Sequence, residues 1–89
     1  MLFPTDGDRI VLTRAGRDGR TRSWIGTVSE VTPYERGSSG LWIGGWRLQG
    51  RNMATGEDFD SHLACTEALE RYDTGIRQTV RMATAADET

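Results

Sequence analysis

Arginine and tryptophan side chains form the largest group of residues in this sequence that could bind a ligand. An arginine can clamp a phosphate or carboxylate with two parallel hydrogen bonds, and a tryptophan can stack on a nucleic-acid base. The segment 15–22, AGRDGRTR, has the highest local density of arginine. The residues that we expect to bind a ligand are Arg17, Arg20, Arg22, Trp24, Arg47 and Arg51. The alternative is that the arginines are solvated loop residues and that Trp24, Trp42 and Trp46 belong to the core.

His62 and Cys65 are the single histidine and the single cysteine of the chain. Their spacing of three would place both side chains on one face of a helix, within reach of one metal ion. A tetrahedral site would need two further ligands, and the nearby aspartates follow no known ligand pattern. We therefore expect no metal and no cofactor, and we expect both side chains to pack under the sheet.

Glu57, Asp58 and Asp60 are the carboxylates whose spacing could serve acid–base catalysis. They flank a predicted turn that is open to water, where carboxylates stay ionised and have no catalytic role at neutral pH. The glycines at 16 and 19 lack the lysine and the helix of a phosphate-binding loop. No catalytic motif is present, so we expect a protein that is not an enzyme.

The charge of the chain is unevenly distributed. The formal net charge is −2, which argues against general coating of nucleic acid. Residues 1–52 hold 8 arginines and 5 acidic residues, whereas residues 53–89 hold 3 arginines and 8 acidic residues. Either the positive half binds a partner, or the two halves pair with each other.

A single cysteine allows no disulfide within the chain, which favours a reducing, cytoplasmic setting. No apolar run approaches the roughly 18 residues of a membrane span, and the N-terminus lacks the pattern of a secretion signal. We expect a cytoplasmic protein that does not bind membranes. At 89 residues the chain has room for one domain, which we place at 1–82 with a flexible tail over 83–89.

Alternating side chains predict strands in the first half of the chain. The first covers 9–14, with Ile10 and Leu12 as its core pair, and the second covers 23–31. Gly26 interrupts the second strand and indicates a bulge or a sharp bend. The segment 32–40 has the composition of a loop, and 41–50 is the third strand.

The second half begins with a predicted hairpin over 51–61, whose turn is 54–57 and whose Phe59 lies on an edge strand. From His62 the apolar spacing changes to three and four, which predicts a short helix over 62–72. The segment 76–82 forms either a last short strand, with Ile76, Gln78, Val80 and Met82 on one face, or a second helix; we expect the strand.

These elements predict a mainly β fold, a small antiparallel five-stranded barrel with one short helix near the C-terminus. A glycine-aspartate turn, Gly7-Asp8, leads into Ile10 and Val11, and a second glycine and valine follow at Gly26 and Val28. This pattern, over about the first third of the chain, resembles the Src-homology-3-like (SH3-like) barrels, including the KOW type. The resemblance implies an SH3-like barrel.

The function predicted from these observations is that of a non-catalytic binding module of the protein-interaction or assembly type. It would use the edge of the barrel and the exposed aromatic and arginine side chains to bind a protein partner or a second copy of itself. The acidic isoelectric point favours this reading. The alternative is a nucleic-acid-binding module that uses the 14–22 arginine loop, which the local arginine density favours.

Overall fold

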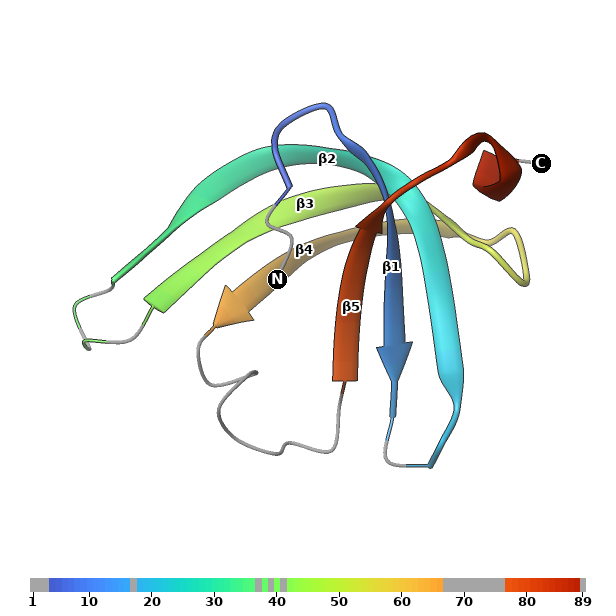
Figure 1. The fold of residues 1–89 in the computed structure, drawn as a ribbon, viewed down its shortest axis with the longest axis horizontal. Coiled ribbons are helices and arrows are strands. Elements are labelled where there is room, and N and C mark those ends of the chain that lie inside the picture. Colours follow the sequence, from blue (N-terminus) through green and yellow to red (C-terminus); the bar gives the residue numbers. More distant parts are fainter. Residues whose placement is uncertain are drawn as a thin grey trace.

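The computed structural model describes residues 4–16, 18–36, 38, 40, 42–66 and 77–88. These residues form one antiparallel sheet with the strand order β4-β3-β2-β1-β5, followed by a short 3-10 helix, η1 (Figure 1). The elements are β1 (Arg9–Ala15), β2 (Thr21–Arg36), β3 (Trp42–Asn52), β4 (Asp58–Thr66), β5 (Arg77–Met82) and η1 (Ala85–Glu88). The prediction of a mainly β, antiparallel, five-stranded protein is confirmed.

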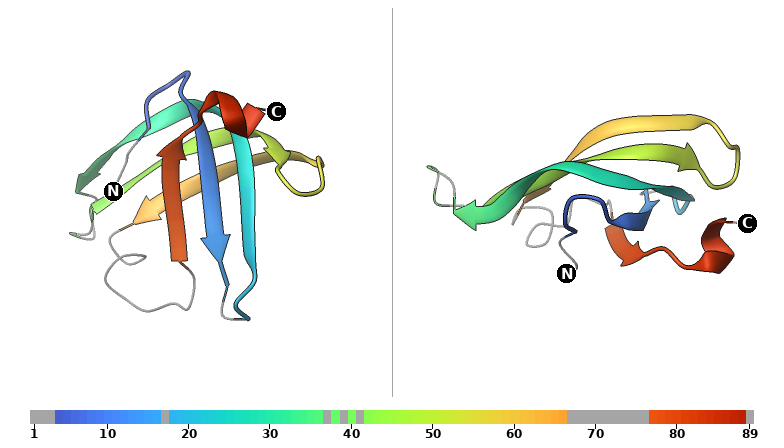
Figure 2. Two further views of the ribbon diagram at one scale, coloured as in Figure 1. Left: turned by 45° about the vertical axis from the view of Figure 1, so that its right-hand side comes forward. Right: turned by 90° about the horizontal axis from the view of Figure 1, so that it is seen from above.

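Strand β2 belongs to both halves of the sheet because it bends along its length. Its first part pairs with β1, and from Trp24 to Arg36 it pairs with β3. Seen from above in Figure 2, β3 and β4 lie on one side of β2, and β1, β5 and η1 lie on the other. The sheet thus folds over on itself and encloses a core on its inner face.

A pair of glycines lies in this bend. Gly26 of β2 is the register partner of Gly50 of β3, and a Cβ atom added to Gly50 would lie 1.8 Å from the carbonyl oxygen of Ile25. Only glycine allows the two backbones to approach so closely. The pairing runs through Gly26 without a register shift, so Gly26 marks a bend and no bulge.

The inner face holds a cluster of six buried apolar side chains. They are Ile10, Leu12, Val28, Trp46, Leu48 and Leu63. The predicted core pair of β1 is confirmed, and Trp46 is a core residue. The opposite face of β1 is also partly apolar, because Val11 and its register partner Ile25 are buried there.

Two predicted element boundaries are wrong. The predicted helix over 62–72 is a strand as far as Thr66, because Leu63 continues the alternation of β4 and packs beside its register partner Trp46. Residues 67–72 lie outside the described residues. The predicted loop over 32–40 is a strand as far as Arg36. Its proline, Pro33, lies where the β2–β3 register shifts, so its missing N–H costs no ladder bond.

The predicted hairpin turn and last strand are confirmed. Gly56 adopts a φ of 76° in the turn between β3 and β4, and β5 covers 77–82. The predicted closure into a barrel is not confirmed. In the described part of the chain, β4 and β5 are the two edges of the sheet, and no ladder joins them.

The Gly26–Gly50 contact predicts a strong effect of one added methyl group. Gly50→Ala should lower the free energy of unfolding by more than about 3 kcal/mol, the upper end of ordinary overpacking, because the new Cβ would meet backbone atoms. Gly56→Ala is the control: its Cβ would meet no atom within 4 Å, so only the cost of a positive φ remains, about 1–2 kcal/mol. Urea unfolding monitored by tryptophan fluorescence measures both, and equal losses would contradict the prediction.

Candidate binding surface

The six residues expected to bind a ligand do not form one surface. Arg17 lies outside the described residues. Arg22 and Trp24 share the inner face of β2 with the core, whereas Arg47 and Arg51 lie on the outer face of β3. A binding role for these residues remains a prediction, but the structure divides them between two faces.

Arg47 is held by carboxylates of its own chain. Its Nε and Nη2 atoms donate to the two carboxylate oxygens of Asp60, at 2.8 and 2.7 Å, and Glu30 lies 3.6 Å from its Nη1. The hydrogen bond from Arg47 lowers the pKa of Asp60. An arginine engaged on both edges by carboxylates has little capacity left for a phosphate.

The C-terminal segment neutralises two further arginines. Arg9 donates to both oxygens of Glu88, at 2.7 and 3.2 Å, and Arg81 donates to both oxygens of Asp87, at 2.8 Å each. Two of the three bidentate pairs, Arg9–Glu88 and Arg47–Asp60, join the basic half of the sequence to the acidic half. The uneven charge of the sequence could reflect a partner surface or pairing between its two halves. For Arg9 and Arg47 it reflects pairing between the halves.

Segment 83–89, expected to be a flexible tail, contains η1 and these ion pairs as far as residue 88. Ala83 also donates its N–H to the carbonyl of Arg9, at 2.9 Å. The flexibility of the segment stays a prediction. What the structure describes is a turn attached to β1 and β5 by side-chain and backbone contacts.

The arginines at the β1–β2 hairpin end of the sheet, unlike Arg9, Arg47 and Arg81, form no bidentate pair with a carboxylate among the described residues. Arg14 and Arg22 are register partners, so two guanidinium groups of like charge leave the same face of adjacent strands. Arg14 donates to the neutral Gln78 at 2.9 Å, and Arg22 has no hydrogen-bond or ion-pair partner among the described residues. Arg20 is 3.8 Å from Asp18, and both side chains are exposed. Of the arginines described on β1 and at the start of β2, those at this end therefore have the fewest carboxylate partners.

Trp24 packs within its own chain. Its ring stacks on that of Phe59, with centroids 5.1 Å apart, and both side chains are half-buried. Phe59 is the register partner of Gly50, so the two rings lie over the glycine pair. One face of Trp24 is thus already occupied by an aromatic ring.

The two edges of the sheet offer different backbone groups. Ala83 donates to the carbonyl of Arg9, so odd-numbered residues of β5 bond to β1. Because bonding alternates along an antiparallel strand, the N–H and C=O groups of Gln78, Val80 and Met82 point to the open side. Asn52 donates its N–H to the carbonyl of Glu57, so odd-numbered residues of β4 bond to β3. By the same alternation, the N–H and C=O groups of Asp58, Asp60 and His62 point to the open side of β4.

Met82 is the residue that the sequence analysis passed over. Its side chain is 48% exposed, and Val80, two residues earlier, is half-buried against the core. The alternation of the last strand was visible in the sequence. Alternation does not show which strand lies at an edge of the sheet, so the predicted binding edge could not be assigned to β5.

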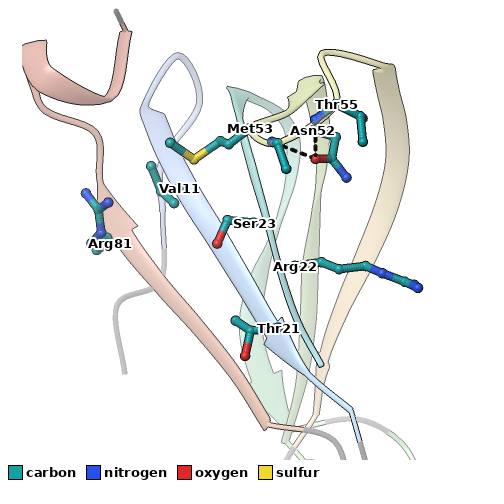
Figure 3. A pocket seen from close by; sticks show the side chains of 9 residues that line it. Val11, Thr21, Arg22, Ser23, Asn52, Met53, Thr55 and Arg81 are labelled. Carbon is teal, nitrogen blue, oxygen red and sulfur yellow. Dashed lines mark hydrogen bonds between the residues drawn. The ribbon is translucent and has the colours of Figure 1, made fainter. Parts of the chain in front are cut away.

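An open hollow of about 560 Å³ lies between the β3–β4 turn, β2 and β5 (Figure 3). Two of its polar side chains are engaged in structure: Asn52 Oδ1 accepts from the N–H groups of Ala54 and Thr55, and Ser23 bonds Thr13. The Arg22 and Arg81 side chains point away from each other in Figure 3. The hollow therefore has no group of converging polar atoms of the kind that catalysis requires.

The structure gives the metal and acid–base candidates no support. His62 is exposed on β4, so the prediction that it packs under the sheet is wrong. The strand also lacks the helical spacing that would bring it beside Cys65. Glu57, Asp58 and Asp60 are exposed. Among the residues that the structure covers, no group of three histidine, cysteine or acidic side chains could hold a metal ion.

Comparison with protein-family models, with curated proteins and with solved structures finds no match to this chain. Within the described ranges, no helix has the length and apolar character that crossing a membrane requires.

The ion pairs of η1 predict how the C-terminal turn responds to acid. Arg81, with the N–H of Thr84, holds the pKa of Asp87 well below its ordinary value of about 3.9. The attachment of η1 should therefore be complete above about pH 4 and should weaken as pH falls through the depressed pKa. An NMR titration of the Asp87 carboxyl should give a midpoint well below 3.9.

Arg81→Gln should return the Asp87 midpoint toward its ordinary value. Arg47→Gln is the control, because it removes the partner of Asp60 and leaves the Asp87 contacts intact. An ordinary Asp87 midpoint in the unmodified chain would contradict the attachment of η1.

Proposed function

We propose that this chain is a non-catalytic binding module of the protein-interaction type, which takes up an extended segment of a protein as an added strand beside β5. The observation that carries the proposal is that, among the described strands, β5 is an edge strand and pairs only with β1. It presents the backbone groups of Gln78, Val80 and Met82, next to a methionine that is 48% exposed. Addition of a strand to such an edge is a common mode of peptide recognition.

The contrast with β4 supports β5 as the binding edge. The outward backbone groups of β4 belong to Asp58, Asp60 and His62, and charged side chains on an edge strand discourage pairing with another strand. The outward groups of β5 belong to residues without charge, and β5 contains no acidic residue. An added strand would meet a neutral, partly apolar edge.

The side chains of β5 indicate the pattern of the partner. Val80 and Met82 share the inner face with the core, whereas Thr79 and Arg81 lie on the outer face. A segment with an apolar residue at every second position would extend the apolar inner face and cover Met82. Main-chain hydrogen bonds would supply affinity, at about 0.5–1.5 kcal/mol net each.

We also infer an SH3-like barrel architecture in which the opening between β4 and β5 is the site of the added strand. The bend of β2 and the place of β1 between β2 and β5 support this inference. The single cysteine supports a cytoplasmic setting.

Met82→Arg should weaken strand addition because a charge would replace the exposed apolar side chain at the edge. The probe is a ten-residue peptide of alternating valine and threonine with a fluorescent label. We expect the dissociation constant to rise about tenfold, equivalent to ~1.4 kcal/mol, in fluorescence anisotropy. Met53→Arg is the matched control, since Met53 is 38% exposed and lies in the β3–β4 turn. Equal effects of the two substitutions, or no peptide binding to the unmodified chain at a concentration where it is monomeric, would contradict the proposal.

A second candidate function is binding of single-stranded nucleic acid at the hairpin end of β1 and β2. The specific observation is that Arg14, Arg20 and Arg22 have only one carboxylate, Asp18, in contact with them among the described side chains. Arginines of this kind can contact the phosphates of a nucleic acid. The acidic net charge opposes this candidate, so we place it second.

For this candidate, binding of a twenty-nucleotide single strand should be detectable at about 50 mM salt and should fall steeply as salt rises. Arg20→Gln with Arg22→Gln should reduce the slope of log affinity against log salt by about 1.4, the value for two lost phosphate contacts. Arg9→Gln with Arg47→Gln is the matched control, because those guanidinium groups are already neutralised. Equal losses in both double variants, or no binding at about 50 mM salt, would rule out the hairpin arginines.

A further inference from the structure

We propose that the strand added beside β5 is β5 of a second copy of this chain, paired antiparallel and centred on Val80. This inference rests on the proposed function of the β5 edge and names the partner. The resulting dimer would have a twofold axis through Val80, and the two sheets would become one continuous sheet. Twofold dimers of this kind present the same patch from both subunits.

The hydrogen-bonding pattern selects this register. The outward N–H and C=O groups belong to the even-numbered residues Gln78, Val80 and Met82. With Val80 opposite Val80, Gln78 of each copy lies opposite Met82 of the other, and all three residues exchange both of their bonds. A register centred on Met82 would leave Gln78 without a partner. A shift of one residue would bring inner and outer faces together.

The side chains are also compatible with their own copies. On the inner face Val80 meets Val80, and the exposed Met82 packs beside Gln78. On the outer face Thr79 lies opposite Arg81, so Arg81 does not face its own copy. The edge is therefore self-complementary in polarity and charge at these positions.

Pairing of β5 with β4 of another copy is the competing arrangement. Aspartates of β4 would face arginines of β5, but Asp60 is already bound by Arg47, and Arg81 is already bound by Asp87. These charges therefore give little net attraction between copies. Head-to-tail pairing of this kind would also continue without closure and produce filaments, which a light-scattering experiment would detect.

Cysteine crosslinking tests the register directly. In a Cys65→Ser background, Val80→Cys places two thiols on facing residues of a hydrogen-bonded pair, about 5.5 Å apart at Cα, within disulfide range. Mild oxidation should convert most of this variant to covalent dimer. Thr79→Cys is the control: Thr79 is more exposed, but its copies would lie too far apart for a disulfide. Equal crosslinking of the two variants would overturn the register.

The unmodified chain gives a second readout that does not depend on an inserted cysteine. Light scattering over a concentration series should show a monomer–dimer equilibrium, and Met82→Arg should raise the dissociation constant of the dimer at least about tenfold. A strict monomer at about 1 mM, or growth beyond the dimer, would overturn the inference. A strict monomer that still binds the valine–threonine peptide would leave the proposed function standing, whereas failure of both would remove both.

Discussion

The close contact of Gly26 with Gly50 is the constraint on which the rest of this structure depends. Without side chains at these two positions, β2 and β3 approach each other closely enough for the sheet to fold over. The fold brings β1 and β5 to one side of the core and β3 and β4 to the other (Figure 2). Trp24 and Phe59 then stack over the glycines, a contact worth about 0.5–1.5 kcal/mol beyond its buried area. A sheet that stayed flat would leave the inner face open to water.

Most of the buried apolar side chains lie on the inner face, whereas the outer face combines the buried Val11 and Ile25 with ion pairs. Arg47 and Asp60 lie diagonally across β3 and β4 on the outer face, and the C-terminal segment adds Glu88 beside Arg9. Such exposed pairs contribute little stability individually, because water and salt screen them. Their consequence for function is larger: they leave the uncompensated positive charge at the β1–β2 hairpin and so restrict where an anion could bind.

Much of this architecture could be predicted from residues next to one another in the sequence. Alternation identified the core pair of β1, and the glycine at 56 identified the turn between β3 and β4. The prediction failed where a distant partner decides the conformation. Leu63 keeps β4 extended because Trp46 lies beside it, and Pro33 is accommodated because the β2–β3 register shifts around it. Neither effect is visible in a local window of sequence.

The candidate site was harder to predict for the same reason. The sequence shows that arginines are abundant, but their carboxylate partners lie 13 and 79 positions away for Arg47 and Arg9. Which arginines are neutralised is therefore a property of the fold. Trp24 could not be assigned from its position either, since its stacking partner is on β4.

The difference between the two edges follows from the same alternation that builds the core. On β4 the residues whose backbone faces outward are those whose side chains lie on the charged outer face. On β5 the residues whose backbone faces outward have their side chains on the apolar inner face. The reason is that the odd-numbered residues of β5 form the hydrogen bonds with β1. A one-residue change in the β1–β5 register would exchange these roles and put Arg81 at the open edge. The neutral character of that edge is thus fixed by the hydrogen bonding of β5 to β1, which is the pairing that also buries Ile10 and Leu12.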